Sequence, residues 1–192
     1  MSNKLNKKHF REKNKKYYQD LESLYQLLVP ESKSILEIGC GNGELLNKLN
    51  PSIAIGIESD RELVEEANDQ YPNIKVIQAT SDEISIQLMN SIKFDIIILN
   101  NNLNTVNDVQ LLLEKLELFS HENTRLIISF HNWLWQPFLK LAERLGERQP
   151  QPPESWLTQG DINNLLNISG WEILKQGTRF LIPRDIPIIS SF

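Results

Sequence analysis

The sequence predicts an α/β fold: a doubly wound, mostly parallel sheet of the seven-stranded type with helices on both faces. Short, almost wholly apolar runs alternate with helix-like runs, which is typical of a parallel sheet covered on both sides. The first apolar run enters a helix through three closely spaced glycines, as in folds where a ligand touches backbone. The length of 192 residues allows one domain with a full core.

The predicted elements follow each other without a repeat or a dividing linker. A helix over residues 10–28, with apolar residues at helical spacing, ends before Pro30. Five predicted strands then alternate with helices. The strands cover residues 34–38, 52–57, 74–77, 94–99 and 125–130, and the helices cover residues 42–49, 60–70, 82–91 and 107–119.

The pattern changes after the fifth strand. We expect an apolar helix over 133–145, an extended proline-rich loop at 149–153, a helix over 158–168, and strand-like segments at 171–175 and 179–182. The helix over 133–145 is either a wall of the core or acceptor pocket or a membrane-surface contact.

Composition excludes several classes of protein. No run approaches the roughly 18 apolar residues of a membrane span, and the lysine-rich N-terminus lacks the apolar segment of a secretory signal. The single cysteine, Cys40, excludes an internal disulfide and a multi-cysteine zinc site. The three histidines are scattered, so no metal site is expected. A cytoplasmic location is the default expectation.

Charge divides the chain into two parts. Residues 1–16 hold seven Lys or Arg and one acid, although the whole chain has a net charge of -5. We expect a basic, partly disordered tail at 1–16 and a single acidic domain at 17–192. The tail is either solvated or a contact for nucleic acid, anionic lipid or an acidic partner. The acidic body disfavours broad nucleic-acid contact.

The glycine loop is the first candidate site. Gly39, Gly41 and Gly43 form G-x-G-x-G, which differs from the G-x-G-x-x-G of dinucleotide sites. Glu37 ends the preceding strand, where its carboxylate suits a cationic ammonium group and repels a pyrophosphate. Cys40 fits this loop by its small size. A glycine-rich turn without a ligand is the alternative.

Residues 35–43, Ile-Leu-Glu-Ile-Gly-Cys-Gly-Asn-Gly, resemble the first motif of the Rossmann-like S-adenosylmethionine-dependent methyltransferases. The resemblance implies that S-adenosylmethionine is the cofactor and that the loop, with Glu37, passes its methionine part. Glu58 and Ser59 follow the second strand, where a carboxylate can accept from both ribose hydroxyls. An exposed strand-end acid is the alternative for Glu58.

Two further loops extend the expected site. Thr80, Ser81 and Asp82 resemble the methyltransferase motif that frames adenine, although the family often has Asp where this chain has Thr80. Asn100 begins an asparagine-rich loop at the carboxyl end of the fourth strand, which faces the site in such sheets. This loop lacks the motifs of nucleic-acid base methyltransferases.

Other residues have two interpretations. His131, after the fifth strand, is either a general base for a hydroxyl substrate or a satisfied hydrogen-bonding residue. Tyr17 and Tyr18 either close over the cofactor from the N-terminal helix or belong to the core.

Residues 17–43, 103–112 and 133–157 also resemble a bacterial methyltransferase subgroup joined to, or encoded beside, family 2 glycosyltransferases. This resemblance implies a glycan or glycolipid acceptor and a possible glycosyltransferase partner. Members of the subgroup continue with a further strand beyond the segment matching 183–192. Either residues 179–182 supply the final antiparallel strand or it is missing, which leaves a sheet edge for a homodimer or partner to cover.

The sequence therefore predicts an S-adenosylmethionine-dependent methyltransferase that acts on a small-molecule or glycan-like acceptor, with O-methylation as the expected reaction. Two rivals remain. One is a non-catalytic protein of the same fold that acts through a partner chain. The other is a nicotinamide-dependent oxidoreductase, which the glycine spacing and Glu37 disfavour.

Overall fold

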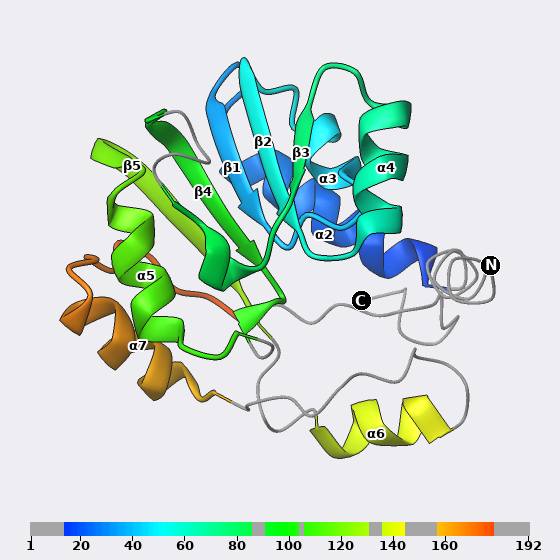
Figure 1. Cartoon of the computed structure of the whole chain (residues 1–192). Helices are drawn as coiled ribbons and strands as arrows, with labels where there is room; N and C mark the ends of the chain where they lie inside the picture. The colour runs from blue at the N-terminus through cyan, green and yellow to red at the C-terminus, as the bar shows by residue number, and fades with distance from the viewer. Residues whose placement is uncertain (1–13, 86–90, 104–105, 131–135, 145–156, 179–192) are drawn as a thin grey trace.

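The computed structural model describes residues 14–85, 91–103, 106–130, 136–144 and 157–178, which contain a five-stranded sheet of order β3-β2-β1-β4-β5 (Figure 1). All four strand pairs are parallel. The strands are β1 Ser34–Ile38, β2 Ile53–Glu58, β3 Lys75–Gln78, β4 Phe94–Asn100 and β5 Ser120–Ser129. The order reverses between β1 and β4, and ligands bind at this switch point in open α/β sheets.

Helices cover both faces of the sheet, which confirms the doubly wound fold (Figure 1). The helices are α2 Lys15–Leu28, α3 Glu44–Lys48, α4 Arg61–Gln70, α5 Val109–Glu117, α6 Gln136–Arg144 and α7 Gln159–Ile168, with a 3-10 turn, η1, at Ser81–Glu83. Three begin at side-chain caps: Asp60 accepts from Glu62 N, Asp108 accepts from Leu111 N, and Thr158 accepts from Asp161 N. Each cap satisfies an amide that the first helical turn leaves without a partner.

The alternation of side chains along the strands builds two apolar clusters. Ile35 of β1 packs with Tyr25 of α2 and with residues of α3 and α4. Leu36, the next residue, packs in the cluster that contains Leu113 of α5 and Ile162 of α7. Successive side chains of a strand point to opposite faces, so Glu37 lies on the same face as Ile35.

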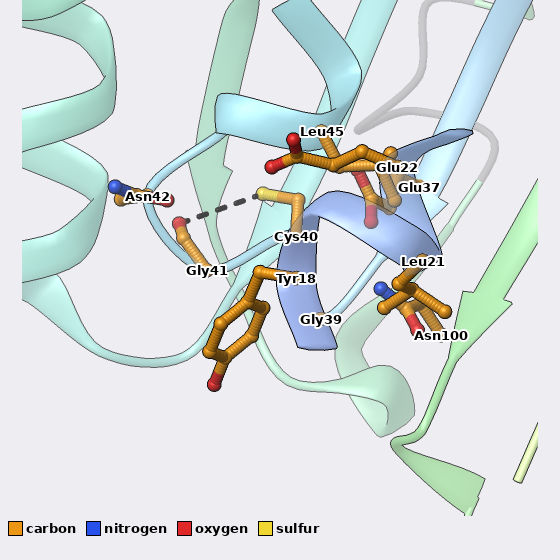
Figure 2. A pocket seen from close by; sticks show the side chains of 10 residues that line it. All are labelled: Tyr18, Leu21, Glu22, Glu37, Gly39, Cys40, Gly41, Asn42, Leu45 and Asn100. Carbon is orange, nitrogen blue, oxygen red and sulfur yellow. Dashed lines mark hydrogen bonds between the residues drawn. The ribbon is translucent and has the colours of Figure 1, made fainter. Parts of the chain in front are cut away.

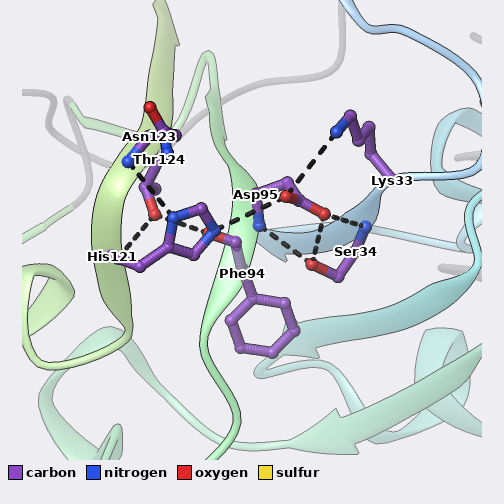
Figure 3. Close-up of polar contacts among 7 residues, drawn as sticks. All are labelled: Lys33, Ser34, Phe94, Asp95, His121, Asn123 and Thr124. Carbon is purple, nitrogen blue, oxygen red and sulfur yellow. Dashed lines mark hydrogen bonds and ion pairs between the residues drawn. The ribbon is translucent and has the colours of Figure 1, made fainter.

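A polar cluster joins three strands at the amino end of the sheet (Figure 3). Asp95 of β4 accepts from Ser34 N at 2.9 Å and from Ser34 Oγ at 2.8 Å. Lys33 and His121 contact the other carboxylate oxygen at 3.8 Å and 3.5 Å. This cluster lies at the opposite end of the strands from the glycine loop, so it stabilises the sheet and takes no part in the candidate site.

The structure differs from the sequence-based expectation at three places. Residues 171–178 form no strand, because Trp171 packs instead on the α5 side, where its Nε1 donates to Leu113 O at 3.1 Å. β5 begins at Ser120, before the expected residue 125, because Ser120 pairs with Phe94 across a register shift, where Thr124 Oγ1 also donates to Phe94 O at 2.6 Å. The helix expected from residue 82 is only the short turn η1 among the residues described there.

Other expected features lie outside the described residues. These are the tail at 1–13, His131 and the tryptophans after it, the proline-rich loop, and residues 179–192 with the expected last strand. Of the helices that the structure does describe, none has the length and apolar character needed to cross a bilayer.

Candidate functional site

A cavity of about 160 Å³ opens at the carboxyl end of β1, beside the switch point (Figure 2). Its lining comes from α2, β1, the glycine loop, α3 and the end of β4. The lining residues are Tyr18, Leu21, Glu22, Glu37, Gly39, Cys40, Gly41, Asn42, Leu45 and Asn100. Glu37, Gly39, Cys40, Gly41 and Asn100, five of the residues expected in the site from the sequence, thus share one cavity.

Backbone hydrogen bonds fix the glycine loop against β2. The amides of Gly39 and Cys40 both donate to Ile57 O, at 2.7 Å and 3.1 Å. The next loop amide, Gly41 N, donates to Glu58 Oε2 at 2.9 Å. The loop is therefore held in one conformation by its neighbour strand before any ligand is considered.

Two glycines of the loop differ in the space around them: Gly43 is tightly packed, and Gly41 faces open space. Gly43 has φ +73°, and a Cβ at this position would lie 2.6 Å from Ile74 Cδ1 and 3.3 Å from Ala67 Cβ. Gly43 therefore allows the loop to pack on α4 and on the segment between α4 and β3. Gly41 also has a positive φ, +58°, but a Cβ there would meet nothing within 4 Å. Gly41 lines the cavity, so the open space beside it leaves room for ligand atoms next to the backbone.

Cys40 serves packing in this loop. Its side chain is buried and lies against Gly56 of β2, where a Cβ would collide with the Cys40 sulfur. Burial raises the pKa of the Cys40 thiol, and the charges of Glu37 and Glu58 raise it further. The thiol therefore stays protonated and is not a nucleophile. This agrees with the sequence-based view that Cys40 is there for its size.

Glu37 supplies a buried carboxylate to the cavity. Only 1% of the residue is exposed, and it is paired in register with Gly56 of β2 and Ile98 of β4. A second carboxylate in the lining, Glu22 of α2, forms an ion pair with Lys48 Nζ at 2.6 Å. Lys48 also pairs with Glu44 at 2.8 Å. The lining of the cavity therefore includes two carboxylates, Glu22 on α2 and Glu37 inside the sheet.

The loop after β4 forms the other side of the site. Asn100 Oδ1 accepts from Ser129 Oγ at 3.0 Å and from Asn101 Nδ2 at 3.2 Å. Asn101 Nδ2 also donates to Tyr17 Oη at 3.1 Å, which connects this loop to α2. Asn102 Nδ2 donates to Ile38 O, directly before the glycine loop. The β4 loop is thus bonded to both the N-terminal helix and β1.

Glu58 and Ser59 lie next to the glycine loop without lining the cavity. Glu58 Oε1 accepts from Asp60 N at 2.9 Å and from Ser59 Oγ at 3.3 Å, in addition to the bond from Gly41. The carboxylate therefore bridges the end of β2 and the glycine loop. This position is the one expected from the sequence for a ribose-binding acid.

Thr80, Ser81 and Asp82 form a separate group after β3. Thr80 caps η1 through a reciprocal pair of bonds with Glu83, so its hydroxyl is already engaged. Asp82 is bonded to the α5 side: its carboxylate accepts from Asn107 Nδ2 at 3.0 Å and its carbonyl accepts from Lys115 Nζ at 2.6 Å. These residues lie at the carboxyl end of β3, outside the cavity. Their expected adenine contacts remain a prediction.

The contribution of α2 exceeds what we inferred from the sequence, where only Tyr17 and Tyr18 were considered. Leu21, Glu22 and Tyr25 lie three, four and seven residues after Tyr18, so all four residues lie on one side of the helix. The first three line the cavity, and Tyr25 is buried beside it. The helical spacing was visible in the sequence, but it could not indicate which element this face would meet. No group of His, Cys, Asp and Glu in the described ranges has the arrangement of a metal site.

Comparison with known proteins adds sequence relatives. A family model described as a methyltransferase domain matches residues 30–170. A protein of Invertebrate iridescent virus 6, named "Putative methyltransferase 235L", is 30% identical over 88 residues, which are 43% of this chain and 31% of the viral protein. The chain therefore spans about a third of that relative's length.

Solved structures share the fold at low identity. A possible histamine N-methyltransferase of Thermotoga maritima has a TM-score of 0.68 at 19% identity, over 86% of this chain and 76% of that chain. A methyltransferase of Haloferax volcanii, in complex with the Trm112 activator, has a TM-score of 0.71 at 13% identity. The match covers 88% of this chain and 76% of that chain. The plantazolicin methyltransferase BpumL in complex with SAH (S-adenosylhomocysteine) has a TM-score of 0.64 at 19% identity. The match covers 86% of this chain and 68% of that chain.

The fold, the cavity at the switch point and the family model agree. The match covers the whole sheet and the glycine loop, and it runs from just after α2 to the end of α7. This chain belongs to the methyltransferase domain family.

Proposed function

We propose that this chain transfers a methyl group from S-adenosylmethionine to a hydroxyl of a small-molecule or glycan-like acceptor. The observation that carries the proposal is the cavity that joins the G-x-G-x-G loop to buried Glu37 at the switch point of the sheet. Membership of the methyltransferase family and the cofactor product in the plantazolicin enzyme support the same cofactor.

The polar side chains of the cavity fit the methionine end of S-adenosylmethionine. Glu37 provides an acceptor for an ammonium group, and Asn100 lines the same cavity with an amide. The open space beside Gly41 leaves room for ligand atoms against backbone. A nicotinamide dinucleotide fits less well, because its pyrophosphate would approach the Glu37 charge.

Each group of residues has a distinct role in this proposal. Glu37 and the loop Gly39–Gly43 hold the methionine part, Glu58 with Ser59 the ribose, and Thr80–Asp82 the adenine. The bound cofactor supplies a methyl group already activated by a sulfonium. The chain therefore contributes positioning of the acceptor and exclusion of water rather than strong acid or base chemistry. His131 remains a proposed base, outside the described residues.

The acceptor is proposed from the resemblance to the glycosyltransferase-associated subgroup, which favours a glycan or glycolipid hydroxyl and a glycosyltransferase partner. The structural relatives show that this fold serves other acceptors: one acts on plantazolicin, a second is a possible histamine N-methyltransferase. Asn100, at the end of β4, brings an amide with both a donor and an acceptor group to the cavity lining. Its chemistry suits a polar acceptor.

A second candidate is a non-catalytic chain of this fold that acts through a partner. The observation in its favour is β5, whose outer edge pairs with no strand in the described part of the chain. The Haloferax relative, which is bound to an activator chain, offers a precedent for partner dependence.

The test is methyl transfer from labelled S-adenosylmethionine to panels of oligosaccharides, glycolipids, small alcohols, histamine and azole-containing peptides. We expect label in the hydroxyl-bearing glycan panel and none with Glu37→Gln. Transfer only to amines or peptides would replace the proposed acceptor and keep the methyltransferase. Cofactor binding without transfer to any panel would favour the partner-dependent candidate.

A further inference from the structure

A chain of three hydrogen-bonding side chains runs from the buried face of helix α2 to the cavity. Tyr25 Oη donates to Ser129 Oγ at 3.0 Å, and Ser129 Oγ donates to Asn100 Oδ1 at 3.0 Å. Tyr25 lies on α2, Ser129 ends β5 and Asn100 ends β4, so the contacts join segments far apart in sequence. The roles proposed above use neither Tyr25 nor Ser129.

The direction of these bonds follows from the single proton that each of the two hydroxyl groups carries. Tyr25 is 1% exposed, and burial raises the pKa of its hydroxyl, so the group stays protonated. A buried hydroxyl donates its proton, and Ser129 Oγ is the atom placed to accept it. A serine hydroxyl that accepts from Tyr25 has one proton of its own, which goes to Asn100 Oδ1.

The result is a defined orientation of the Asn100 amide. Its Oδ1 accepts from Ser129 and also from Asn101 Nδ2 at 3.2 Å, so the Nδ2 group points the other way. Among the residues that the structure describes, Nδ2 of Asn100 donates to no protein group. In Figure 2 this nitrogen is turned toward the Glu37 side of the cavity and the oxygen away from it. The cavity therefore presents an N–H donor together with a carboxylate.

We propose that Tyr25 and Ser129 are positioning residues, which hold the Asn100 amide nitrogen toward the cavity so that it binds the carboxylate of the ligand's α-amino-acid end. Glu37 accepts from the ammonium group of the same end. An α-amino acid carries one anionic and one cationic group, and the pair Asn100 and Glu37 complements both. This inference rests on the proposed function, because S-adenosylmethionine is the ligand that brings such an end to this site.

The test compares two ligands that differ in that end. S-adenosylhomocysteine carries the α-amino-acid group, and 5′-methylthioadenosine lacks it. We expect Tyr25→Phe and Ser129→Ala each to weaken S-adenosylhomocysteine binding by about three- to tenfold, the effect of one hydrogen bond. Binding of 5′-methylthioadenosine should stay unchanged. Ser129→Thr keeps a hydroxyl and should bind nearly as the parent chain does.

Ser34→Ala is the matched control, since it removes a largely buried hydroxyl at the opposite end of the sheet. Thermal unfolding identifies any variant that does not fold, and Ser129→Ala serves if Tyr25→Phe fails. Unchanged S-adenosylhomocysteine affinity in the folded variants overturns the positioning role and leaves the cofactor assignment intact. Equal weakening of both ligands overturns it as well, because that result indicates general damage. A parent chain that binds neither ligand removes the proposed function, and this inference with it.

Discussion

At the scale of single residues, Glu58 links the ligand site to the loop that forms it. Its carboxylate accepts from Gly41 N and from Asp60 N, so it fixes the glycine loop while lying where a ribose is expected. Loss of this side chain removes a bond from the loop and, under the proposed function, also the acceptor for the ribose.

Glu58→Ala should weaken S-adenosylmethionine binding by about 1–3 kcal/mol, because a hydrogen-bonded carboxylate is removed. Calorimetric titration measures this change. Glu62→Ala is the control, because Glu62 is an exposed acid on the neighbouring helix α4. Affinity that stays at the parent value in Glu58→Ala would place Glu58 outside the site.

The glycines of the loop should respond differently to alanine. Gly43→Ala brings a methyl group to within 2.6 Å of Ile74 Cδ1 and also strains the backbone at φ +73°. Gly41→Ala strains the backbone but meets no protein atom. The left-handed conformation costs about 1–2 kcal/mol in both, and overpacking adds about 1–3 kcal/mol for Gly43 alone.

Urea unfolding of the two variants should thus show the larger loss of stability for Gly43→Ala. Ligand titration should show the larger relative loss of affinity for Gly41→Ala, whose methyl group enters the space beside the cavity. The reverse order of stabilities would contradict the packing described for Gly43.

At the scale of elements, the polar cluster at the amino end of the sheet makes stability depend on pH. Hydrogen bonds from Ser34 N and Ser34 Oγ lower the pKa of Asp95 below its usual value of 3.8. A carboxyl with a lowered folded pKa stabilises the fold above its unfolded pKa. That contribution is lost as pH falls through the folded value.

Ser34→Ala should therefore cost about 1–2 kcal/mol at neutral pH, and its deficit relative to the parent should narrow below about pH 4. Urea unfolding at neutral pH and near pH 3 measures both values. Ser120→Ala is the control, because Ser120 Oγ donates to Leu116 O and no carboxylate is involved. A deficit that is equal at both pH values would remove Asp95 from the explanation.

The elements also show what the sequence could predict. β1 occupies residues 34–38 as expected, because Ile35, Leu36 and Ile38 form a short apolar run directly before the glycines, and all five residues are buried. The start of β5 was not predictable, because it depends on the pairing of Ser120 with Phe94 of another strand. Residues 171–175 are apolar enough for a strand, but Trp171 packs with α5 instead.

The candidate site also has a part that the sequence could predict and a part that it could not. Glycines and an acid at fixed spacing were sufficient to predict that Glu37, Gly39 and Gly41 lie together, since the motif is local, and the three line one cavity. Asn100 followed from its place at a strand end. The contact from Ser129 and the face of α2 depend on tertiary packing between distant segments, which no local pattern encodes.

At the scale of the whole molecule, the outer edge of β5 decides how the chain behaves in solution. No described strand pairs with this edge, and its residues from Leu126 to Phe130 are only half-buried. A strand edge that no other strand of the same chain pairs with favours association. We expect either a dimer or modest stability as a monomer.

Sedimentation velocity over a range of concentrations, together with urea unfolding, tests this expectation. A replacement of Ile127 by Lys at the edge strand should reduce association if β5 forms the contact, and Leu118→Lys on the exposed end of α5 is the control. A monomer of high stability would contradict the expectation.

The most direct test of the central claim is calorimetric titration of the chain with S-adenosylmethionine, S-adenosylhomocysteine and NAD in parallel. The cavity beside Glu37 predicts binding of the first two in the micromolar range, which corresponds to about -8 kcal/mol, and no binding of NAD. Binding of NAD alone, or of none of the three, would contradict a methyltransferase cofactor site in this chain.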